Sequence, residues 1–249
     1  MLDLRRDGFL GGRLQIWQPA RGYRSGADAV MLAAACHAKP GEAVLELGCG
    51  AGVALLCLGA RVPNLDLVGV EMQPVFVELA HRNLIENNQK GEVVEASIEA
   101  LPLALRQRSF DHVIANPPYF TEGTIAPDEA RGRARHEVTT VAIWIDAALR
   151  RLRPGGRVTV IQKADRLGHV LNALGNRAGD IAILPIAARA GRNAGRVIIS
   201  AKKGAGGPLR ICPPFIMHAR HRHEGDSEDL TPDATAILRN GQVLQFCDI

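Results

Sequence analysis

The stretch Ala43-Val44-Leu45-Glu46-Leu47-Gly48-Cys49-Gly50-Ala51-Gly52 joins a mainly apolar run to a turn that contains three glycines. An apolar run that ends in a glycine turn predicts a buried strand. Because glycine carries no Cβ, the backbone of the turn can approach a ligand closely. The next residues, 53–60, predict a helix whose N-terminal amides point at the same ligand. The stretch therefore predicts a strand–turn–helix unit of a parallel sheet, with a ligand at its turn.

Strand and helix signals alternate on both sides of this unit. Five segments predict helices: 27–38, 53–60, 74–87, 142–152 and 166–176. Seven apolar runs predict strands: 43–47, 67–70, 93–94, 112–115, 158–161, 181–184 and 197–200. Strands that alternate with helices form a parallel sheet covered on both faces. We therefore predict an α/β fold with a Rossmann-like, mostly parallel sheet of seven strands flanked by helices.

Glycine and proline segments mark the limits of the predicted units. Two short runs around Gly11-Gly12 predict a hairpin, so residues 1–26 are expected to form an N-terminal hairpin extension. Pro154-Gly155-Gly156 predicts a stop between the helix at 142–152 and the next strand. The glycine-rich segment 203–208 predicts the end of the core. The expected division is a core at 27–203 and a C-terminal extension of the same domain at 204–249.

Composition limits the class of protein. The chain has 249 residues, of which 47% are hydrophobic, and no run is long enough to span a membrane. The N-terminus lacks the basic-then-apolar pattern of a signal peptide, so a cytoplasmic protein is expected. The cysteines show no Cys-x-x-Cys spacing, which predicts reduced core residues: Cys36, Cys49, Cys57, Cys212 and Cys247. His218, His221 and His223 could form a metal site with Cys212, but without a second cysteine no metal is predicted.

The residues around the glycine turn indicate which ligand it binds. The pattern Gly-x-Gly-x-Gly differs from the Gly-x-Gly-x-x-Gly of dinucleotide sites, and the Glu46 carboxylate would repel a phosphate but attract an ammonium group. Glu71 ends the next predicted strand, nineteen residues beyond Gly52, where an acid can accept hydrogen bonds from two ribose hydroxyls. A nucleoside with an ammonium group and no pyrophosphate is S-adenosylmethionine, which we predict as the cofactor.

A second motif, Asn116-Pro117-Pro118-Tyr119, follows the predicted strand at 112–115. The Asn116 side-chain oxygen and the Pro117 carbonyl can each accept one hydrogen of a planar amine, which turns the nitrogen lone pair toward a methyl donor. The prolines hold these acceptors rigidly, and the Tyr119 ring can stack on the target. Because asparagine does not titrate, the motif predicts catalysis by positioning and electrostatics rather than by a base. The two motifs together predict methyl transfer to a planar nitrogen.

The charge of the chain is unevenly distributed. Residues 104–223 hold 20 Lys and Arg against 8 Asp and Glu, a balance of +12, while the remainder is −8. Such asymmetry predicts a polyanionic partner on one face, with simple solubility as the alternative. Three arginines in the segment after Tyr119 are expected to grip phosphates around a splayed-out base: Arg131, Arg133 and Arg135. The Arg150-Arg151-Arg153 group closes a helix and can instead favour the helix dipole.

With these residues in view, the chain resembles the tRNA1(Val) adenine-N6 methyltransferase family, which has a class I methyltransferase core of the small-domain type. The resemblance rests on the segments 25–32, 46–52 and 114–119, and runs from about Arg13 to Leu238. It implies S-adenosylmethionine, and an adenine beside the tRNA anticodon as the target. The catalytic motif of the family corresponds to 116–119. The resemblance implies these cofactor-binding positions: Asp28, Glu46, Gly48, Cys49, Gly50, Glu71, Met72, Ser97, Ile98 and Asn116.

The chain departs from the family at one position, and the residues leave other substrates open. The family commonly has an acid after the third strand that holds the cofactor adenine, where this sequence has Ser97. Asn-Pro-Pro-Tyr also occurs in enzymes that methylate a guanine amine or a glutamine amide. The sequence therefore predicts an S-adenosylmethionine-dependent N-methyltransferase acting on adenine N6 in RNA, foremost tRNA. The alternatives are a glutamine-amide methyltransferase, a small-molecule methyltransferase and a non-catalytic RNA-binding module.

Overall fold

The computed structural model describes residues 3–118, 141–220 and 229–247. Its strands are β1 Leu4–Phe9, β2 Leu14–Pro19, β3 Ala43–Leu47, β4 Asp66–Glu71, β5 Glu92–Glu95, β6 Phe110–Ala115, β7 Leu152–Lys163, β8 Ala178–Ala187, β9 Ala194–Lys203, β10 Arg210–Ile211 and β11 Phe215–Ile216. Its helices are α1 Ala27–Ala35, α2 Val53–Arg61, α3 Pro74–Glu86, α4 Leu103–Arg106, α6 Val141–Arg151, α7 Leu167–Leu174 and α8 Pro232–Leu238. No described helix has the length and apolarity needed to cross a bilayer.

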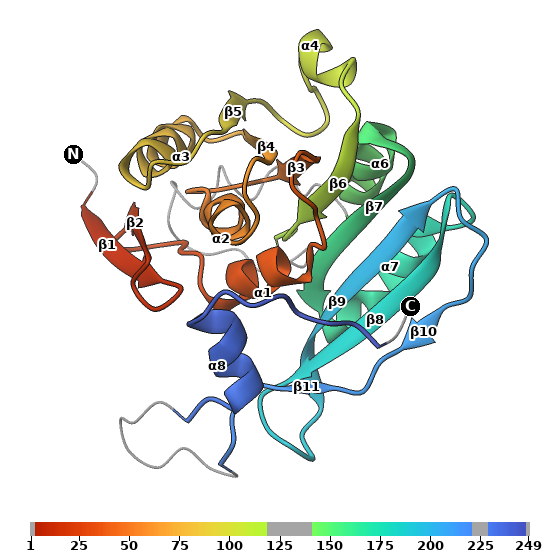
Figure 1. The fold of residues 1–249 in the computed structure, drawn as a ribbon. Coiled ribbons are helices and arrows are strands. Elements are labelled where there is room, and N and C mark those ends of the chain that lie inside the picture. Colours follow the sequence, from red (N-terminus) through yellow and green to blue (C-terminus); the bar gives the residue numbers. More distant parts are fainter. Residues whose placement is uncertain (1–2, 119–140, 221–228, 248–249) are drawn as a thin grey trace, which may run out of the picture.

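The strands form a separate hairpin and one large mixed sheet (Figure 1). Strands β3 to β7 pair in parallel, while β9 runs antiparallel between β7 and β8. The order is β10-β8-β9-β7-β6-β3-β4-β5, with β11 also paired to β8. The predicted α/β sheet is confirmed, and all seven predicted strands are in it. Among the described residues the sheet has nine strands rather than seven, because two-residue segments at β10 and β11 extend its edge.

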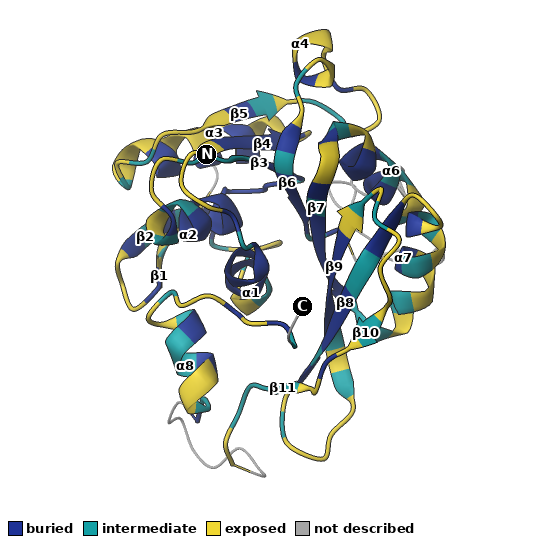
Figure 2. Ribbon diagram, turned by 45° about the vertical axis from the view of Figure 1, so that its right-hand side comes forward, coloured by how far each residue is buried: buried dark blue, intermediate teal, exposed yellow. Residues whose placement is uncertain are grey.

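Apolar strands are covered by helices on both faces, which gives two cores. One core lies between the sheet and α1, α2 and α3, and the C-terminal segment also packs into it. The other lies between the sheet and α6 and α7. Figure 2 shows the consequence, since the strands are buried while the helices keep an exposed side. A parallel sheet buried on both faces requires near-continuous apolar strands, as the runs at 43–47 and 112–115 are.

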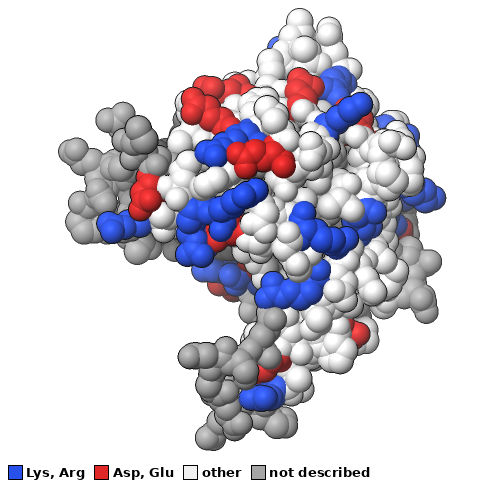
Figure 3. Space-filling model, turned by 60° about the vertical axis from the view of Figure 1, so that its left-hand side comes forward, with Lys and Arg blue, Asp and Glu red and all other residues white. Residues whose placement is uncertain are grey.

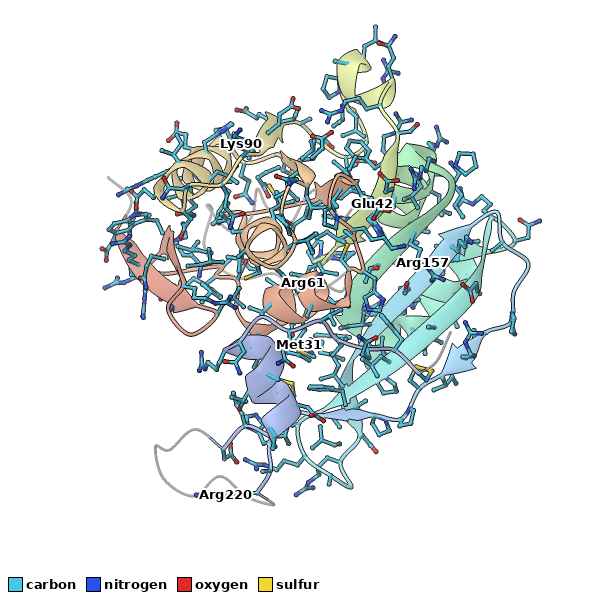
Figure 4. The ribbon with its side chains drawn as sticks, viewed as in Figure 1. Met31, Glu42, Arg61, Lys90, Arg157 and Arg220 are labelled. Carbon is cyan, nitrogen blue, oxygen red and sulfur yellow. A yellow bond between two sulfur atoms is a disulfide. The ribbon has the colours of Figure 1, made fainter. Side chains whose placement is uncertain are left out.

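The two edges of the parallel strands differ in chemistry. The glycine turn, Met72, Ser97 and Asn116 follow the carboxyl ends of β3, β4, β5 and β6, so they lie at the same edge. At the amino-terminal edge, Glu42 (Figure 4) bonds to His112 at 3.0 Å, and burial lowers the pKa of that histidine despite the carboxylate. Ligands of open α/β sheets bind at the carboxyl edge.

One predicted boundary is wrong. Pro154-Gly155-Gly156 does not separate a helix from a strand, because α6 ends at Arg151 and β7 begins at Leu152. Leu152 pairs with Phe110 and Arg157 pairs with His112, so residues 153–156 bulge out opposite Asp111. A bulge tolerates proline because its missing N–H is not needed in the ladder.

The cysteine expectation is wrong for two of the five residues. Cys212 and Cys247 form a disulfide with a Cα–Cα distance of 5.2 Å, while Cys36, Cys49 and Cys57 are free and buried. The segment before Cys247 also contacts the end of α1, where the Leu244 N–H donates to the Ala34 carbonyl at 2.9 Å. The pairing brings together residues 35 positions apart, a proximity that sequence spacing does not reveal.

Candidate cofactor and target site

The glycine turn between β3 and α2 has a backbone conformation that favours glycine. Gly48, Gly50 and Gly52 have φ angles of 67°, 53° and 83°, in the left-handed region that side chains disfavour. The turn is tied to the neighbouring strand because the Cys49 N–H donates to the Val70 carbonyl at 2.9 Å. The turn is therefore a fixed concave backbone at the carboxyl edge of the sheet.

Glu71, at the end of β4, organises this turn. Its Oε2 accepts the Gly50 N–H at 3.0 Å, and its Oε1 accepts the N–H groups of Met72 and Gln73, both at 2.9 Å. The residue is 7% exposed. Each carboxylate oxygen has two lone pairs, so Oε2 keeps capacity for a hydroxyl donor after these bonds. Glu71 is placed beside the glycine turn, as the sequence predicts, and also holds its backbone.

Glu46 is a second carboxyl group under the same turn. It is 4% exposed, and its Oε2 accepts the Leu55 N–H at 3.1 Å, in the first turn of α2. Burial raises the pKa of Glu46 well above its ordinary value, and the nearby charge of Glu71 raises it further, against the Leu55 bond. Two acidic groups in a buried corner favour a cationic ligand, because a positive charge would stabilise both carboxylates. The residues at the turn thus fit a cofactor that carries an ammonium and a sulfonium group.

Exposed apolar side chains border the turn. Met72, which directly follows the buried strand β4, is 50% exposed, and Val75 in the first turn of α3 is 37% exposed. Tyr23, which is 58% exposed, lies 3.8 Å from where a Cβ on Gly50 would be, and its ring meets Phe76 edge-on at 6.2 Å. Partial burial of the hydroxyl raises the pKa of Tyr23, and the carboxylates of Glu46, Asp28 and Glu71 add to this rise. These surfaces suit a planar apolar group such as an adenine.

The remaining predicted cofactor positions surround this corner. Ser97 and Ile98 lie in the segment after β5, which is joined to β4 by a bond from the Ala96 N–H to the Glu71 carbonyl at 2.9 Å. The Ser97 hydroxyl accepts the Glu99 N–H at 3.3 Å. Asp28, at the start of α1, forms an ion pair with Arg196 at 3.0 Å. The structure therefore gathers the predicted cofactor residues at one edge and adds a charged partner to Asp28.

Asn116 begins the second part of the site. Leu47 pairs with Ala115, so Asn116 comes directly after β6 at the level where Gly48 leaves β3. Asn116 is half-buried, Pro117 is buried and Pro118 is exposed. Gln162, a buried residue of β7, donates from Nε2 to the Pro117 carbonyl at 3.4 Å. The target motif is thus adjacent to the cofactor turn, with one of its two acceptors contacted by a glutamine that sequence analysis missed.

Trp144 of α6 is another neighbour of the glycine turn, and no sequence motif pointed to it. A Cβ added to Gly48 would collide with the ring of Trp144. The indole is 8% exposed, and its Nε1 finds no hydrogen-bond partner among the described residues. Gly48 and Trp144 are far apart in the chain, and no local sequence signal links them.

Several residues predicted to contact the substrate cannot be placed relative to the site or lie away from it. Tyr119, Arg131, Arg133 and Arg135 lie outside the described residues, as do His221 and His223. The Arg150 group lies at the opposite, amino-terminal edge, because α6 returns there before β7 begins. Arg150 pairs with Asp146 at 2.7 Å, and Arg151 donates to the Leu105 carbonyl at 3.2 Å. His218 bonds to Asp229 at 2.7 Å.

Comparisons with known proteins agree with this geometry. The family model described as methyltransferase small domain matches residues 26–178. A Porphyromonas gingivalis protein named tRNA1(Val) (adenine(37)-N6)-methyltransferase is 32% identical over 173 residues, which are 65% of this chain and 67% of the relative. A Haemophilus influenzae protein of the same name is 28% identical over 155 residues, 61% of this chain and 67% of the relative.

Solved structures share the fold. A protein from Agrobacterium tumefaciens, described as a predicted O-methyltransferase, has a TM-score of 0.70 and 27% identity, covering 88% of this chain and 98% of its own. A methyltransferase from Pyrococcus furiosus has a TM-score of 0.55 and 19% identity, covering 77% of this chain and 90% of its own. The second likeness concerns the fold alone.

Proposed function

We propose that this chain, which belongs to the methyltransferase small domain family, transfers a methyl group to the N6 amine of an adenine in RNA, with tRNA as the RNA class. It is an S-adenosylmethionine-dependent methyltransferase with the class I fold. The identity of the methyl acceptor and the roles of individual residues are parts of the proposal.

The proposal for the acceptor rests on the juxtaposition of Asn116 and Pro117 with the glycine turn. An exocyclic amine has two N–H donors, and the Asn116 side chain and Pro117 carbonyl are two acceptors that follow one strand end. If the methyl group were transferred to a hydroxyl instead, that hydroxyl could donate only one hydrogen bond to these two acceptors. The curated relatives named above are named for an adenine N6 product in tRNA, which supports the same acceptor.

In this proposal the chain works mainly by positioning. Glu71, Glu46 and the glycine turn hold the cofactor, whose sulfonium supplies an electrophilic methyl group when bound. Asn116 and Pro117 accept the two amine hydrogens, which directs the nitrogen lone pair at the methyl. Gln162 helps to hold the Pro117 carbonyl in place. Because none of these target-side groups is a base, the amine proton leaves to solvent after transfer.

The first experiment identifies the product. Purified protein is incubated with labelled S-adenosylmethionine and total tRNA from a strain that lacks the gene, and the digested nucleosides are analysed by mass spectrometry. We expect N6-methyladenosine, and the same nucleoside missing from the tRNA of that strain. A 2′-O-methyl nucleoside, or methylation of protein glutamine only, would contradict the proposed acceptor.

The second experiment tests the target-side residue. Asn116→Ala should abolish turnover while the affinity for S-adenosylmethionine, measured by calorimetry, stays nearly unchanged. Asn172→Ala is the matched control, because it removes an exposed asparagine of α7 that lies outside both motifs. Near-normal turnover by Asn116→Ala would rule out the positioning mechanism.

A further inference from the structure

We propose that the N-terminal hairpin and the adjoining part of α3 form an RNA-contacting surface, here called the hairpin surface, which consists of Arg5, Arg6, Arg21, Arg24 and Arg82. The inference rests on the proposed function, because it assigns a second contact region to the same RNA substrate. It involves residues outside the basic block at 104–223 that the charge pattern indicated.

Charge is the first observation. Residues 1–26 carry five arginines and two aspartates, although they belong to the part of the chain whose overall balance is acidic. On the hairpin surface, four guanidinium groups share two carboxylates, Asp7 and Glu86, and Arg21 pairs with neither of them. The surface therefore keeps a positive excess after its internal ion pairs. Figure 3 turns this side of the molecule forward and shows Lys and Arg side chains across the middle of the face, with Asp and Glu side chains among and above them.

The guanidinium groups of Arg6 and Arg82 lie over the aromatic ring of Trp17. Arg82 lies 4.2 Å and Arg6 5.9 Å from the centre of the Trp17 ring, within the range of cation–π interactions. Glu86 accepts from the Trp17 Nε1 and the Arg82 Nε, both at 2.8 Å. The side chains of Arg6 and Arg82 nevertheless remain 48% and 44% exposed. Stacked guanidinium groups are pre-organised to donate from their edges to phosphate oxygens.

Arg5 and Arg24 lie on a different side of the hairpin from Arg6. Arg5 and Arg24 both bond to Asp7, at 2.8 Å each. Arg21 is exposed and has no ion-pair partner among the described residues. Successive residues of a strand point to opposite faces, so Arg5 and Arg6 point to different sides. Arginines on two faces of the hairpin can contact several phosphates of one RNA backbone, whereas a single small anion would contact only one face.

The hairpin surface adjoins the candidate site. Leu4 and Trp17 of the hairpin pack on a small core that contains Ala51 of the glycine turn together with Phe76 and Leu79. Tyr23 lies between Arg21 and Arg24 in sequence and packs beside Gly50. An RNA whose base enters the site at Asn116 would thus have its backbone close to these arginines. This position favours a substrate contact over a remote solubilising patch.

The test is a salt titration of tRNA binding. The double variant Arg6→Gln/Arg82→Gln is compared with wild type and with Arg106→Gln/Arg150→Gln, which removes two arginines at the opposite edge. Each phosphate contact releases counterions, so the slope of log K against log salt should become shallower by about 0.7–0.9 per lost contact. We expect this change for the hairpin variant and not for the control. Equal slopes for all three proteins would overturn the proposal.

A second readout separates this inference from the proposed function. The hairpin variant should raise the KM for tRNA while kcat and the affinity for S-adenosylmethionine stay unchanged. Arg21→Gln, which breaks no described ion pair, should show a smaller change in the same direction even if the double variant folds poorly. Normal tRNA methylation and KM in both variants would refute only the hairpin surface. Absence of tRNA methylation by wild type would refute the proposed function itself.

Discussion

Glu71 shows how one side chain can serve both the fold and the cofactor. Its two oxygens accept three backbone N–H groups from Gly50, Met72 and Gln73, and hydrogen bonds to a charged group are each worth about 1.5–3 kcal/mol. A ligand hydroxyl that bonds to Glu71 therefore meets an acceptor that is already oriented. Any substitution there changes the turn as well as the contact.

Glu71→Gln should be nearly as damaging as Glu71→Ala. The amide Nε2 of glutamine is a donor, and in either orientation it would face at least one backbone N–H that now donates to Glu71. We expect the affinity for S-adenosylmethionine to fall at least about tenfold, equal to about 1.4 kcal/mol, in both variants. Calorimetry checks this, with Glu95→Gln at the end of β5 as the control. Wild-type affinity in Glu71→Gln would show that the carboxylate is not needed.

Glu46 predicts a pH dependence of cofactor binding. Burial raises the pKa of this carboxyl in the cofactor-free protein, so the folded chain keeps a proton that the unfolded chain loses near its ordinary pKa. This retained proton stabilises the folded chain fully at pH values below the ordinary pKa. The stabilisation is lost as the pH rises through the raised pKa of the folded chain. If the bound ammonium group requires the carboxylate, affinity should rise by up to about tenfold per pH unit below the raised pKa. Calorimetry from pH 5 to 7 should show this for wild type and a flat profile for Glu46→Gln. The same slope in both proteins would assign the titration to another group.

At the scale of elements, α3 completes the hydrogen bonding of β2. One side of β2 pairs with β1, and the other side meets two asparagines one helical turn apart. Asn83 bonds to the N–H and carbonyl of Trp17 at 2.8 and 3.0 Å, and Asn87 does the same for Gln15 at 2.9 Å. Asn83 also donates to the Ala51 carbonyl at 2.9 Å. The helix therefore acts as a neighbouring strand and joins the hairpin to the glycine turn.

Asn83→Ala should affect both stability and the cofactor site. The residue is fully buried, so its loss leaves backbone groups of Trp17 and Ala51 unsatisfied. We expect the free energy of unfolding to fall by about 2–3 kcal/mol and the affinity for S-adenosylmethionine to fall as well. Asn87→Ala is the matched control, because it also bonds to β2 but not to the turn. If both variants bind the cofactor equally, the hairpin is not coupled to the turn through Asn83.

At the scale of the whole molecule, the C-terminal segment packs against α1 near the start of the chain. The Cys212–Cys247 disulfide joins the end of this segment to the residue after β10, and α8 packs on α1 between them. His37, just after α1, bonds to the Leu244 carbonyl at 2.7 Å. The segment thus covers the face of the molecule opposite α6 and α7.

The disulfide predicts the number of free thiols and part of the stability. Titration of the denatured, unreduced protein should find three thiols, those of Cys36, Cys49 and Cys57. Cross-links of this loop length stabilise by about 2–4 kcal/mol, so Cys247→Ala should lower the free energy of unfolding by about that amount. Cys57→Ala is a control for the loss of a buried cysteine. Five titratable thiols would show that the bond does not form in solution.

The sequence by itself determined the main strands and helices around the sheet and the position of Glu46, Glu71 and Asn116 along them. Apolar runs of strand length, glycine turns and helical stretches are local patterns, and alternation of such patterns allows few topologies. The strand at 43–47 has the predicted bounds, and Glu46, Glu71 and Asn116 meet at one edge because parallel strands end together. The order of these residues along the chain was sufficient to predict that they lie at one edge.

Only the tertiary structure decided which distant residues touch. Trp144 meets Gly48, Gln162 contacts Pro117, Asn83 joins the hairpin to the turn, and Cys212 reaches Cys247. The Arg150 group lies at the amino-terminal edge of the sheet, although it is close to Asn116 along the chain. The physical reason is that periodicity reports which face of an element is apolar, whereas contacts between elements depend on how those faces pack in three dimensions.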